Sequence, residues 1–384
     1  MLNQTSLAAG CGVCDIAWHG FDMEYRMHGV KGLKPILEHA QMEAELVISH
    51  CTFSLDWLLP ELTALNRRAR ISRITIYSKC GRKVVLPTRC SPRLARPLHG
   101  ISRSGKLLLE TCRPGDLPWP HNLTRVVTLP NHGRCDHTYA YHMATRYDQL
   151  SPLVFFLKDT SFKNGWTILK KRQYPVDVMA AQAVSSGFSC RMARRAEHGQ
   201  QYSVWHIREV LTEYESLRYA TKHDQATRPE HRTPFNSPFR PMSAWLSQSG
   251  VFANASSGLL PDVEAPFRQL STQSLWPACY GGGFATKRSQ IRRWPQQMWQ
   301  RLARALSRGD NIEEGHYAER LWAVLLVKPP SRNASRALLC AANRQIRLYQ
   351  ATRQLMGLLY LCNCTSQCSA RGLQALPTPI RELG

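Results

Sequence analysis

The stretch Leu153-Val-Phe-Phe-Leu157, followed at once by Lys158 and Asp159, is the clearest strand signal in the chain. Five consecutive apolar residues that end at charged ones are typical of a strand buried on both faces. Strands of this kind build parallel sheets that helices cover on both sides. The stretch therefore predicts an α/β fold, and it places an acid, Asp159, directly behind a strand.

Other segments of the chain continue this pattern. Short apolar runs that predict further strands lie at residues 45–49, 73–77 and 125–129. Apolar spacing over residues 55–65 and 136–147 predicts two helices, and Asp136 is a candidate N-cap of the second. Because strands alternate with helices, we expect a mainly parallel sheet.

We expect one α/β domain over residues 44–328. Irregular insertions interrupt it at about 82–120 and 220–274, where the chain becomes rich in proline, arginine and small polar residues. Residues 1–43 show no hydrophobic period and are expected to form an irregular lead-in. Residues 329–384 are expected to form a basic, cysteine-containing tail with an amphipathic helix.

The charge of the chain is its main departure from an average composition. Its 384 residues hold 50 Lys and Arg against 27 Asp and Glu, a net charge of +23, while an apolar fraction of 43% is ordinary for a folded domain. Such a field attracts phosphates, nucleic acid, acidic glycans or anionic membrane. The basic residues are dispersed along the chain, which fits a phosphate-handling enzyme and a mere compositional bias equally well.

The sequence leaves the compartment open. It shows no signal peptide and no apolar run long enough to span a bilayer, which fits either a cytoplasmic protein or a Golgi or secretory one whose targeting segment is missing. The 13 cysteines would be free or metal-bound in the first case and largely paired in the second. Five Asn-x-Ser/Thr triplets, which accept N-linked glycans in a lumen, begin at Asn3, Asn122, Asn254, Asn333 and Asn363.

Two stretches in the first half of the chain carry groups suited to ligand binding. Asp159 directly follows a predicted strand, and open α/β sheets bind ligands at the carboxyl ends of strands, so this acid would hold a metal ion that is bound to a phosphate. Its alternative role is to cap a turn. The loop with Asn131 and Arg134 precedes a predicted helix, where backbone N–H groups and a guanidinium favour anions. Its alternative role is a structural turn.

A third stretch, Glu313–Trp322, follows a glycine-rich loop at no great distance in sequence. His316 and Glu319 are three residues apart and share one face of a predicted helix, where they would serve as general base or approach a metal. The alternative is an acid cluster favoured by the helix dipole. Backbone can approach a substrate closely at the three glycines of the loop, Gly281, Gly282 and Gly283.

The order of these motifs resembles a large eukaryotic family of uncharacterised, glycosyltransferase-like proteins of the GT-A type. The resemblance covers residues 45–160 and 275–325. Its motifs are Leu46-Val-Ile-Ser-His50 with Trp57, Ile76-Tyr77 with Lys79 and Gly81, Leu129-Pro-Asn131 with Gly133-Arg134 and His137-Thr-Tyr139, Tyr147-Asp148, Phe155-Phe-Leu-Lys-Asp159, Tyr280-Gly-Gly-x-Phe284, and Glu314-Gly-His-Tyr-x-Glu319-Arg-Leu-Trp322.

The resemblance implies a Rossmann-like domain that moves a sugar from a nucleotide-diphosphate donor to a hydroxyl acceptor. By this resemblance Glu319 would be the catalytic base and His316 a catalytic neighbour or metal ligand. Mn²⁺ or Mg²⁺ would be expected in such an enzyme, yet the chain lacks an Asp-x-Asp motif, so Arg134 or Lys158 would neutralise the diphosphate instead. The residues that would contact the donor are Asn131, Arg134, Asp159, Gly281, Gly282 and Gly283.

Two other hypotheses stay open. One is a non-enzymatic basic module that binds nucleic acid or acidic glycan, and the other is an inactive relative of the enzyme family. The first rests on the basic segment 291–306, which is predicted to be helical with Pro295 in its first turn. Its side chains that would contact a polyanion are Trp294, Trp299, Arg292, Arg293 and Arg301.

Overall fold

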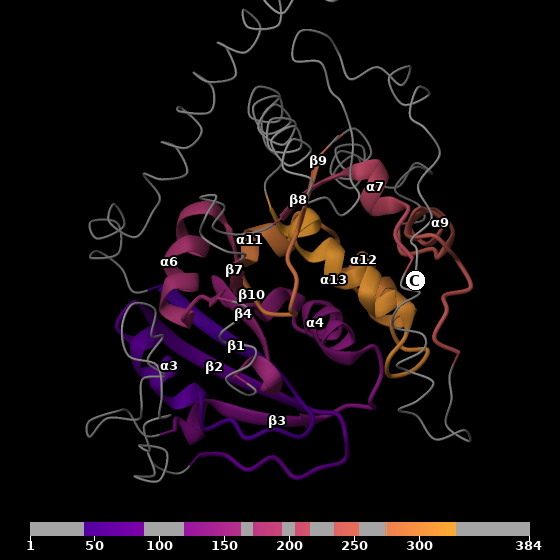
Figure 1. The fold of residues 1–384 in the computed structure, drawn as a ribbon. Coiled ribbons are helices and arrows are strands. Elements are labelled where there is room, and N and C mark those ends of the chain that lie inside the picture. The colour runs from indigo at the N-terminus through magenta and orange to yellow at the C-terminus, as the bar shows by residue number, and fades with distance from the viewer. Residues whose placement is uncertain are drawn as a thin grey trace, which may run out of the picture. The chain divides into compact units, whose positions relative to one another are not determined.

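A six-stranded sheet, ordered β3-β2-β1-β4-β10-β6, organises the fold (Figure 1). Strands β1 to β4 run parallel, and β10 is antiparallel to both of its neighbours. The strand bounds are β1 Met42–His50, β2 Ala69–Ser78, β3 Thr124–Thr128, β4 Leu153–Lys158, β6 Phe188–Cys190 and β10 Phe284–Lys287. The predicted α/β class with a mainly parallel sheet is therefore confirmed.

The computed structural model describes only part of the chain. All described residues fall within the unit Gly32–Pro329. The predicted lead-in up to residue 41, most of the 82–120 insertion and the tail from residue 328 lie outside them. The described ranges are 42–87, 119–162, 172–193, 204–215, 234–252, 273 and 275–327.

Helices cover both faces of the sheet. Two of them, α3 (Leu58–Asn66) and α6 (Val176–Ser186), pack on one face, and α4 (Arg134–Thr145), α12 (Gln296–Ala305) and α13 (Glu313–Leu326) pack on the other (Figure 1). Shorter elements complete the described part: α7 Arg208–Thr212, α9 Met242–Gln248, α11 Arg288–Ile291, η2 His121–Leu123, η3 Tyr147–Gln149, η4 Asp159–Phe162, and the strand pairs β5 Arg172–Gln173 with β7 Met192–Ala193 and β8 Val204–Ile207 with β9 Leu275–Ala278.

Strand β4 shows why its sequence is apolar throughout. Alternate side chains of a strand point to opposite faces. Leu153, Phe155 and Leu157 join the core beneath α3 and α6, whereas Val154 and Phe156 join the core beneath α4, α12 and α13. All five are fully buried. A helical layer on each face therefore requires an apolar residue at every position of this central strand.

The chain reverses its progress across the sheet between β1 and β4. It runs outward from β1 to β2 and β3, and then returns to place β4 on the other side of β1. Connections after β1 and β4 consequently leave their strands in opposite directions. The carboxyl ends of these two parallel strands lie next to each other, with Leu46 paired to Phe155 and Ser49 to Lys158.

The segment 291–306 differs from the single helix that its sequence predicts. Helix α11 ends at Ile291 and α12 begins only at Gln296. Pro295 is the N-cap of α12 with extended backbone (φ −66°, ψ 153°), not a residue of its first turn. Residues 292–294 form a turn between the two helices. Because proline disfavours helical backbone at the preceding residue, Trp294 does not continue into α12.

Part of the segment expected as a surface excursion, 220–274, contributes to the core. Helix α9 buries Met242 and Trp245 in the cluster beneath α13. Trp245 lies against Tyr317, with ring centroids 5.6 Å apart. No helix in the described ranges is long and apolar enough to cross a membrane.

Replacement of Phe156 by alanine should lower the free energy of unfolding by about 3–5 kcal/mol, since it leaves a cavity between the rings of Tyr139 and Phe284. Val126→Ala is the control, because that side chain is 46% exposed on β3, and it should cost at most about 0.5 kcal/mol. Urea denaturation measures both. A loss at Phe156 no larger than that at Val126 would contradict the assignment of β4 to the centre of the core.

Candidate functional site

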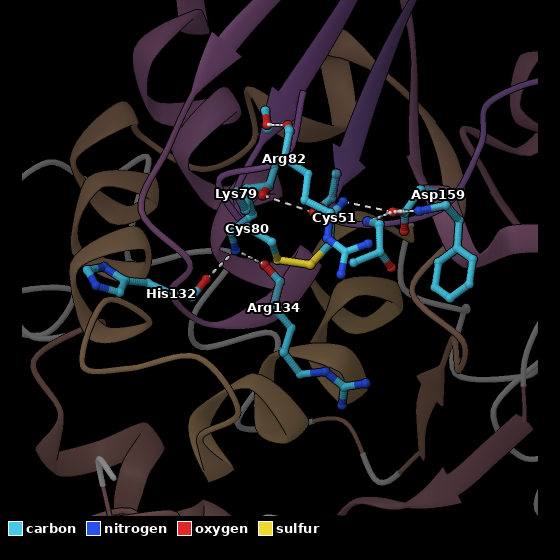
Figure 2. Close-up of a disulfide and its surroundings, with 12 residues drawn as sticks. Cys51, Lys79, Cys80, Arg82, His132, Arg134 and Asp159 are labelled. Carbon is cyan, nitrogen blue, oxygen red and sulfur yellow. Dashed lines mark hydrogen bonds between the residues drawn. A yellow bond between two sulfur atoms is a disulfide. The ribbon is translucent and has the colours of Figure 1, made fainter. Parts of the chain in front are cut away.

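The loops that follow β1 and β2 are joined at the carboxyl edge of the sheet. A disulfide links Cys51 to Cys80, and the Lys79 N–H donates to the His50 carbonyl oxygen over 3.0 Å. Figure 2 shows this disulfide with Lys79 and Asp159 near it. The partner of Cys80 thus comes from the loop after the neighbouring strand, 29 residues away in sequence.

Asp159 fixes the β1 loop to the end of β4. Its Oδ2 accepts hydrogen bonds from the backbone N–H groups of three successive residues, at 2.7, 2.8 and 3.0 Å, and its side chain is buried (Figure 2). Successive N–H groups of this kind form a concave anion site. The residues that donate are Cys51, Thr52 and Phe53. The anion that fills the concavity is thus a side chain of the protein itself.

The start of α4 has an unusual backbone. Gly133 and Arg134 have φ values of +51° and +52°, and Arg134 is the sole non-glycine residue with positive φ among those the structure describes. The ammonium of Lys79 donates to the carbonyl oxygens of His132 and Arg134 and so fixes this backbone (Figure 2). Burial lowers the pKa of Lys79 to about 8.

Asp136 joins α4 to α13. Its Oδ1 accepts a 2.7 Å hydrogen bond from the indole N–H of Trp322, and the carboxyl group is buried. Burial, reinforced by the charge of Glu319, raises the pKa of Asp136 to about 6. Asp136 is therefore not the N-cap that the sequence predicts, since Gly133 occupies that position and the Asp136 side chain turns into the core.

Arg134 is exposed and lies in the field of these acids. Desolvation lowers the pKa of Arg134, but Asp136 and Glu319 among its neighbours raise it more, and the net pKa lies above the ordinary value. Its charge is thereby coupled to α13 across the start of α4. Arg134, Asp136 and Glu319 therefore form one electrostatic cluster.

The glycine loop docks onto this cluster. The Gly281 N–H donates to Glu319 Oε1 over 2.8 Å, and the Tyr139 hydroxyl donates to the Gly282 carbonyl oxygen over 2.5 Å. A Cβ on Gly282 would lie 2.9 Å from Cys135 Sγ and 3.6 Å from Lys158 Nζ. The loop therefore lies against α4 and the end of β4, where a larger residue would not fit.

A second disulfide holds the base of this loop. Cys279, just before the loop, is bonded to Cys190 at the end of β6. The N–H of the next residue, Arg191, donates to the Gly283 carbonyl oxygen over 2.9 Å. Both described disulfides thus lie at the carboxyl edge, where each one ties a loop of the cluster to a neighbouring strand.

His316 and Glu319 lie on α13 beside the glycine loop. His316 is buried, and burial, with Arg134 acting in the same direction, lowers its pKa to about 4, which keeps the imidazole neutral at pH 7. Glu319 is less buried, its side chain being 23% exposed, and its Oε2 lies 3.9 Å from Arg320. The helix thus presents a neutral imidazole and a partly accessible carboxylate.

Most of the predicted site residues meet in one place, whereas Asp159 and Asn131 lie beside it. Arg134, His316, Glu319 and the glycine loop meet around the start of α4, and Asp159 lies one residue beyond Lys158, which borders the same loop. Asn131 lies half-buried in the loop before α4, without a side-chain hydrogen bond to the described residues. Its role on the donor stays a prediction.

Sequence reasoning missed the members of the cluster that are buried and charged. Lys79 and the Tyr139 hydroxyl bond backbone carbonyl oxygens of the cluster, and Asp136 bonds the Trp322 side chain. Lys79 and Tyr139 belong to motifs of the resemblance, but nothing in those motifs predicts these contacts. For Asp136 the sequence predicts a role at the start of a helix, as an N-cap, but not a buried partner. Only the spatial partner, Trp322, shows what it does.

The residues expected to hold a metal, Asp159 and His316, are not joined in a ligand set. Within the described ranges, no group of three or more His, Cys, Asp and Glu side chains could hold a metal ion. The expectation of Mn²⁺ or Mg²⁺ remains untested by this observation.

The aromatic residues proposed to stack on a polyanion are core residues. Trp294 and Trp299 are buried, and their indole N–H groups donate to the carbonyl oxygens of Leu325 and Ile291. Stacking on nucleic acid needs an accessible ring face. The two rings are therefore not available for stacking, and the binding-module hypothesis is left with the arginines of this segment, of which Arg292 is exposed.

One surface depression, of about 340 Å³, lies between α4 and α12. It contains none of the predicted site residues. Its lining residues are His137, Tyr141, Ala144, Thr145, Gln300, Ala303, Arg304 and Ser307.

Comparison of the chain with protein-family models, curated proteins and solved structures finds no match.

Gly133→Ala should strongly destabilise the protein, because a Cβ there would lie 2.5 Å from the Leu306 carbonyl oxygen in addition to the positive φ. Gly81→Ala is a matched control: its φ is +68°, but no atom lies within 4 Å of the added Cβ, so we expect only about 1–2 kcal/mol of backbone strain. Thermal unfolding compares the two. Equal losses would show that the α4 start is not packed as described.

Acid should destabilise the protein partly through His137, because burial lowers the pKa of this residue to about 4 from its ordinary 6.5. Between these pH values the unfolded chain binds more protons, so stability is lost as the pH falls from 6.5 to 4. His137→Gln should remove up to about 3 kcal/mol of that loss.

The measurement is the free energy of urea unfolding at pH 7 and pH 4.5, with His121→Gln, at an exposed histidine, as the control. Burial also raises the pKa of Asp136 to about 6, which acts in the opposite direction and is common to all variants. An unchanged difference between the two pH values in His137→Gln would contradict the assignment.

Proposed function

We propose that the chain is a glycosyltransferase that binds a nucleotide-diphosphate sugar at the carboxyl edge between β1 and β4. The observation that carries this proposal is the reversal of strand order at that edge, with the polar cluster gathered beside it. In open α/β sheets ligands bind in the crevice at such a switch point. The order β3-β2-β1-β4 is that of the first four strands of dinucleotide-binding domains, which supports a Rossmann-like, GT-A-like arrangement.

Arg134 and Lys158 are the groups that would bind the donor diphosphate. Arg134 is exposed at the start of α4, and the Lys158 ammonium lies beside Gly282, 3.6 Å from the place of a Cβ on that residue. Cations aimed at a leaving diphosphate stabilise the charge that develops on it, and a guanidinium matches phosphate geometry. The net charge of +23 would further attract such a donor.

The residues at Asp159 do not fit a divalent cation. One oxygen of its carboxylate already accepts three backbone N–H bonds, and the described residues supply no set of three acidic, histidine or cysteine ligands near it. A divalent ion on Oδ2 would compete with those N–H groups, and Oδ1 by itself would supply only one ligand atom. We therefore assign no step to a metal and give the charge of the leaving group to Arg134 and Lys158.

Glu319 is the proposed general base. Its Oε1 is oriented by the Gly281 N–H, and the 23% exposure of the side chain leaves the carboxylate accessible to an acceptor hydroxyl. The proton of that hydroxyl passes to Glu319 while its oxygen bonds to the sugar C1, and the bond from C1 to the phosphate oxygen breaks. His316, which burial keeps neutral at pH 7 with a pKa of about 4, lies one turn before Glu319 on α13 and adds no charge beside it.

Donor binding is the first prediction. At a concentration of about 100 times its Kd, a bound nucleotide sugar should stabilise the full chain by about 2.7 kcal/mol. Thermal-shift measurements should screen uridine and guanosine diphosphate sugars with EDTA and with Mn²⁺. We expect a donor that raises the melting temperature equally in both buffers. A folded protein that binds none of them would refute the function, and binding that needs Mn²⁺ would refute the role given to Arg134 and Lys158.

Variants separate binding from turnover. Glu319→Gln should keep donor binding and slow sugar transfer by about 10²–10⁴-fold, whereas Arg134→Met should weaken donor binding. Exposed residues away from the cluster give the matched controls, Glu213→Gln and Arg125→Met, and neither should change binding or transfer. Unchanged transfer in Glu319→Gln would overturn the assignment of the base while leaving the donor site intact.

A further inference from the structure

We propose that Asn122 carries an N-linked glycan and that this glycan covers the open edge of the sheet at β3. The proposal concerns a face of the protein away from the predicted site residues and does not depend on the glycosyltransferase function. It rests on three features of the described residues: the acceptor triplet, the paired cysteines and the exposed edge strand.

The acceptor triplet is Asn122-Leu123-Thr124, which satisfies the Asn-x-Thr pattern. Asn122 is exposed in η2, and its side chain forms no hydrogen bond with the described residues. The Thr124 hydroxyl, in contrast, donates to the Pro120 carbonyl oxygen and accepts the Trp119 indole N–H. Those contacts exist only in the folded state, so they do not hinder modification of the nascent chain.

The paired cysteines indicate the compartment in which this modification occurs. Cys51–Cys80 and Cys190–Cys279 are disulfides, and of the five described cysteines only Cys135 is free. Structural disulfides form in oxidising lumens and are rare in the cytosol. N-linked glycans are added in the same kind of lumen, so a chain that forms these bonds would also meet the glycan-transferring enzyme.

The group transfer needs a lipid-linked oligosaccharide diphosphate as its second substrate. The bond between the first sugar C1 and the phosphate oxygen breaks, and C1 bonds to Nδ2 of Asn122. The diphospholipid leaves with the electron pair of the broken bond, and the transferase takes one amide proton. The product is a bulky, solubilising group on the surface.

The glycan would shield the exposed edge of strand β3. This strand is the last of the sheet and pairs, in the described part of the chain, with β2 alone. Val126 at its centre is 46% exposed, and Arg125 and Thr128 are exposed as well. An unpaired edge strand invites pairing with another chain, and native proteins block such edges. Asn122 precedes this strand by two residues, about 7 Å of extended chain, which is within reach of a glycan.

The test is a peptide map of the full chain, secreted from eukaryotic cells behind an added leader. Peptide N-glycosidase in heavy-oxygen water converts a glycosylated asparagine to labelled aspartate, which mass spectrometry locates. We expect label at Asn122 in molecules whose non-reduced map contains the Cys51–Cys80 linkage. An unmodified Asn122 in such molecules would overturn the proposal, and so would secreted protein in which Cys51 and Cys80 are not linked.

A second measurement tests the shielding role without relying on the label. Sedimentation velocity should show a shift of Asn122→Gln toward larger species, and addition of Val126→Lys should reverse the shift because a charge at the edge blocks strand pairing. Asn254→Gln, which removes another acceptor triplet, is the matched control and should sediment like the unaltered protein. Unshifted sedimentation of Asn122→Gln would overturn the shielding role.

Discussion

The hydrogen bonds from three successive backbone N–H groups to the buried carboxylate of Asp159 are the constraint on which the carboxyl edge depends. A buried carboxylate is costly unless its charge is compensated, and the β1 loop compensates it by turning its N–H groups inward. The loop cannot relax without exposing both the acid and the donors. Cys51 belongs to that loop, so the disulfide to Cys80 extends the same constraint to the end of β2.

The hydrogen bonds to Asp159 give this acid at the end of β4 a structural role. An acid at that position in a sequence suggests a ligand for a metal or a nucleotide, but here it replaces an external anion in a site made of backbone N–H groups. Positive charge remains beside it on Lys158 and Arg134, at the point where the sheet reverses its strand order. The edge is therefore rigid on its acidic side and cationic where a phosphate would approach.

Sequence reasoning succeeded where local pattern and tertiary environment agree. Strand β4 is apolar at every position because helices cover both faces, and that property is visible in the sequence itself. The expectation that His316 and Glu319 share a helix also agrees with α13, whose first turn is acidic. Sequence pattern gave the wrong environment for a side chain where contacts with residues distant in sequence decide whether it is buried. Trp299 lies in a basic segment whose composition suggests a binding surface. The packing of α12 against α4 instead places its ring in the core.

The candidate site shows the same division. Glu319 and the glycine loop were associated by proximity in sequence, and a hydrogen bond does join them. The pairing of Cys51 with Cys80 could not be read from spacing, because it depends on which strands become neighbours. Asp136 was misassigned as a cap for a related reason: its partner, Trp322, lies 186 residues away. Local sequence patterns predict a single helix or strand well. The contacts of a site built from several elements can be predicted only when the arrangement of those elements is known.

Cys135 offers a way to observe the glycine loop in motion. Its sulfur lies 2.9 Å from where a Cβ on Gly282 would be, and burial raises the pKa of its thiol to about 12. Cys135 is half-buried, and its protonated thiol reacts slowly with alkylating reagents, because the thiolate is the nucleophile. Movement of the loop away from α4 would expose the sulfur further, so a change in the alkylation rate would report that local opening. The alkylation rate of Cys135 therefore measures movement of the glycine loop relative to α4.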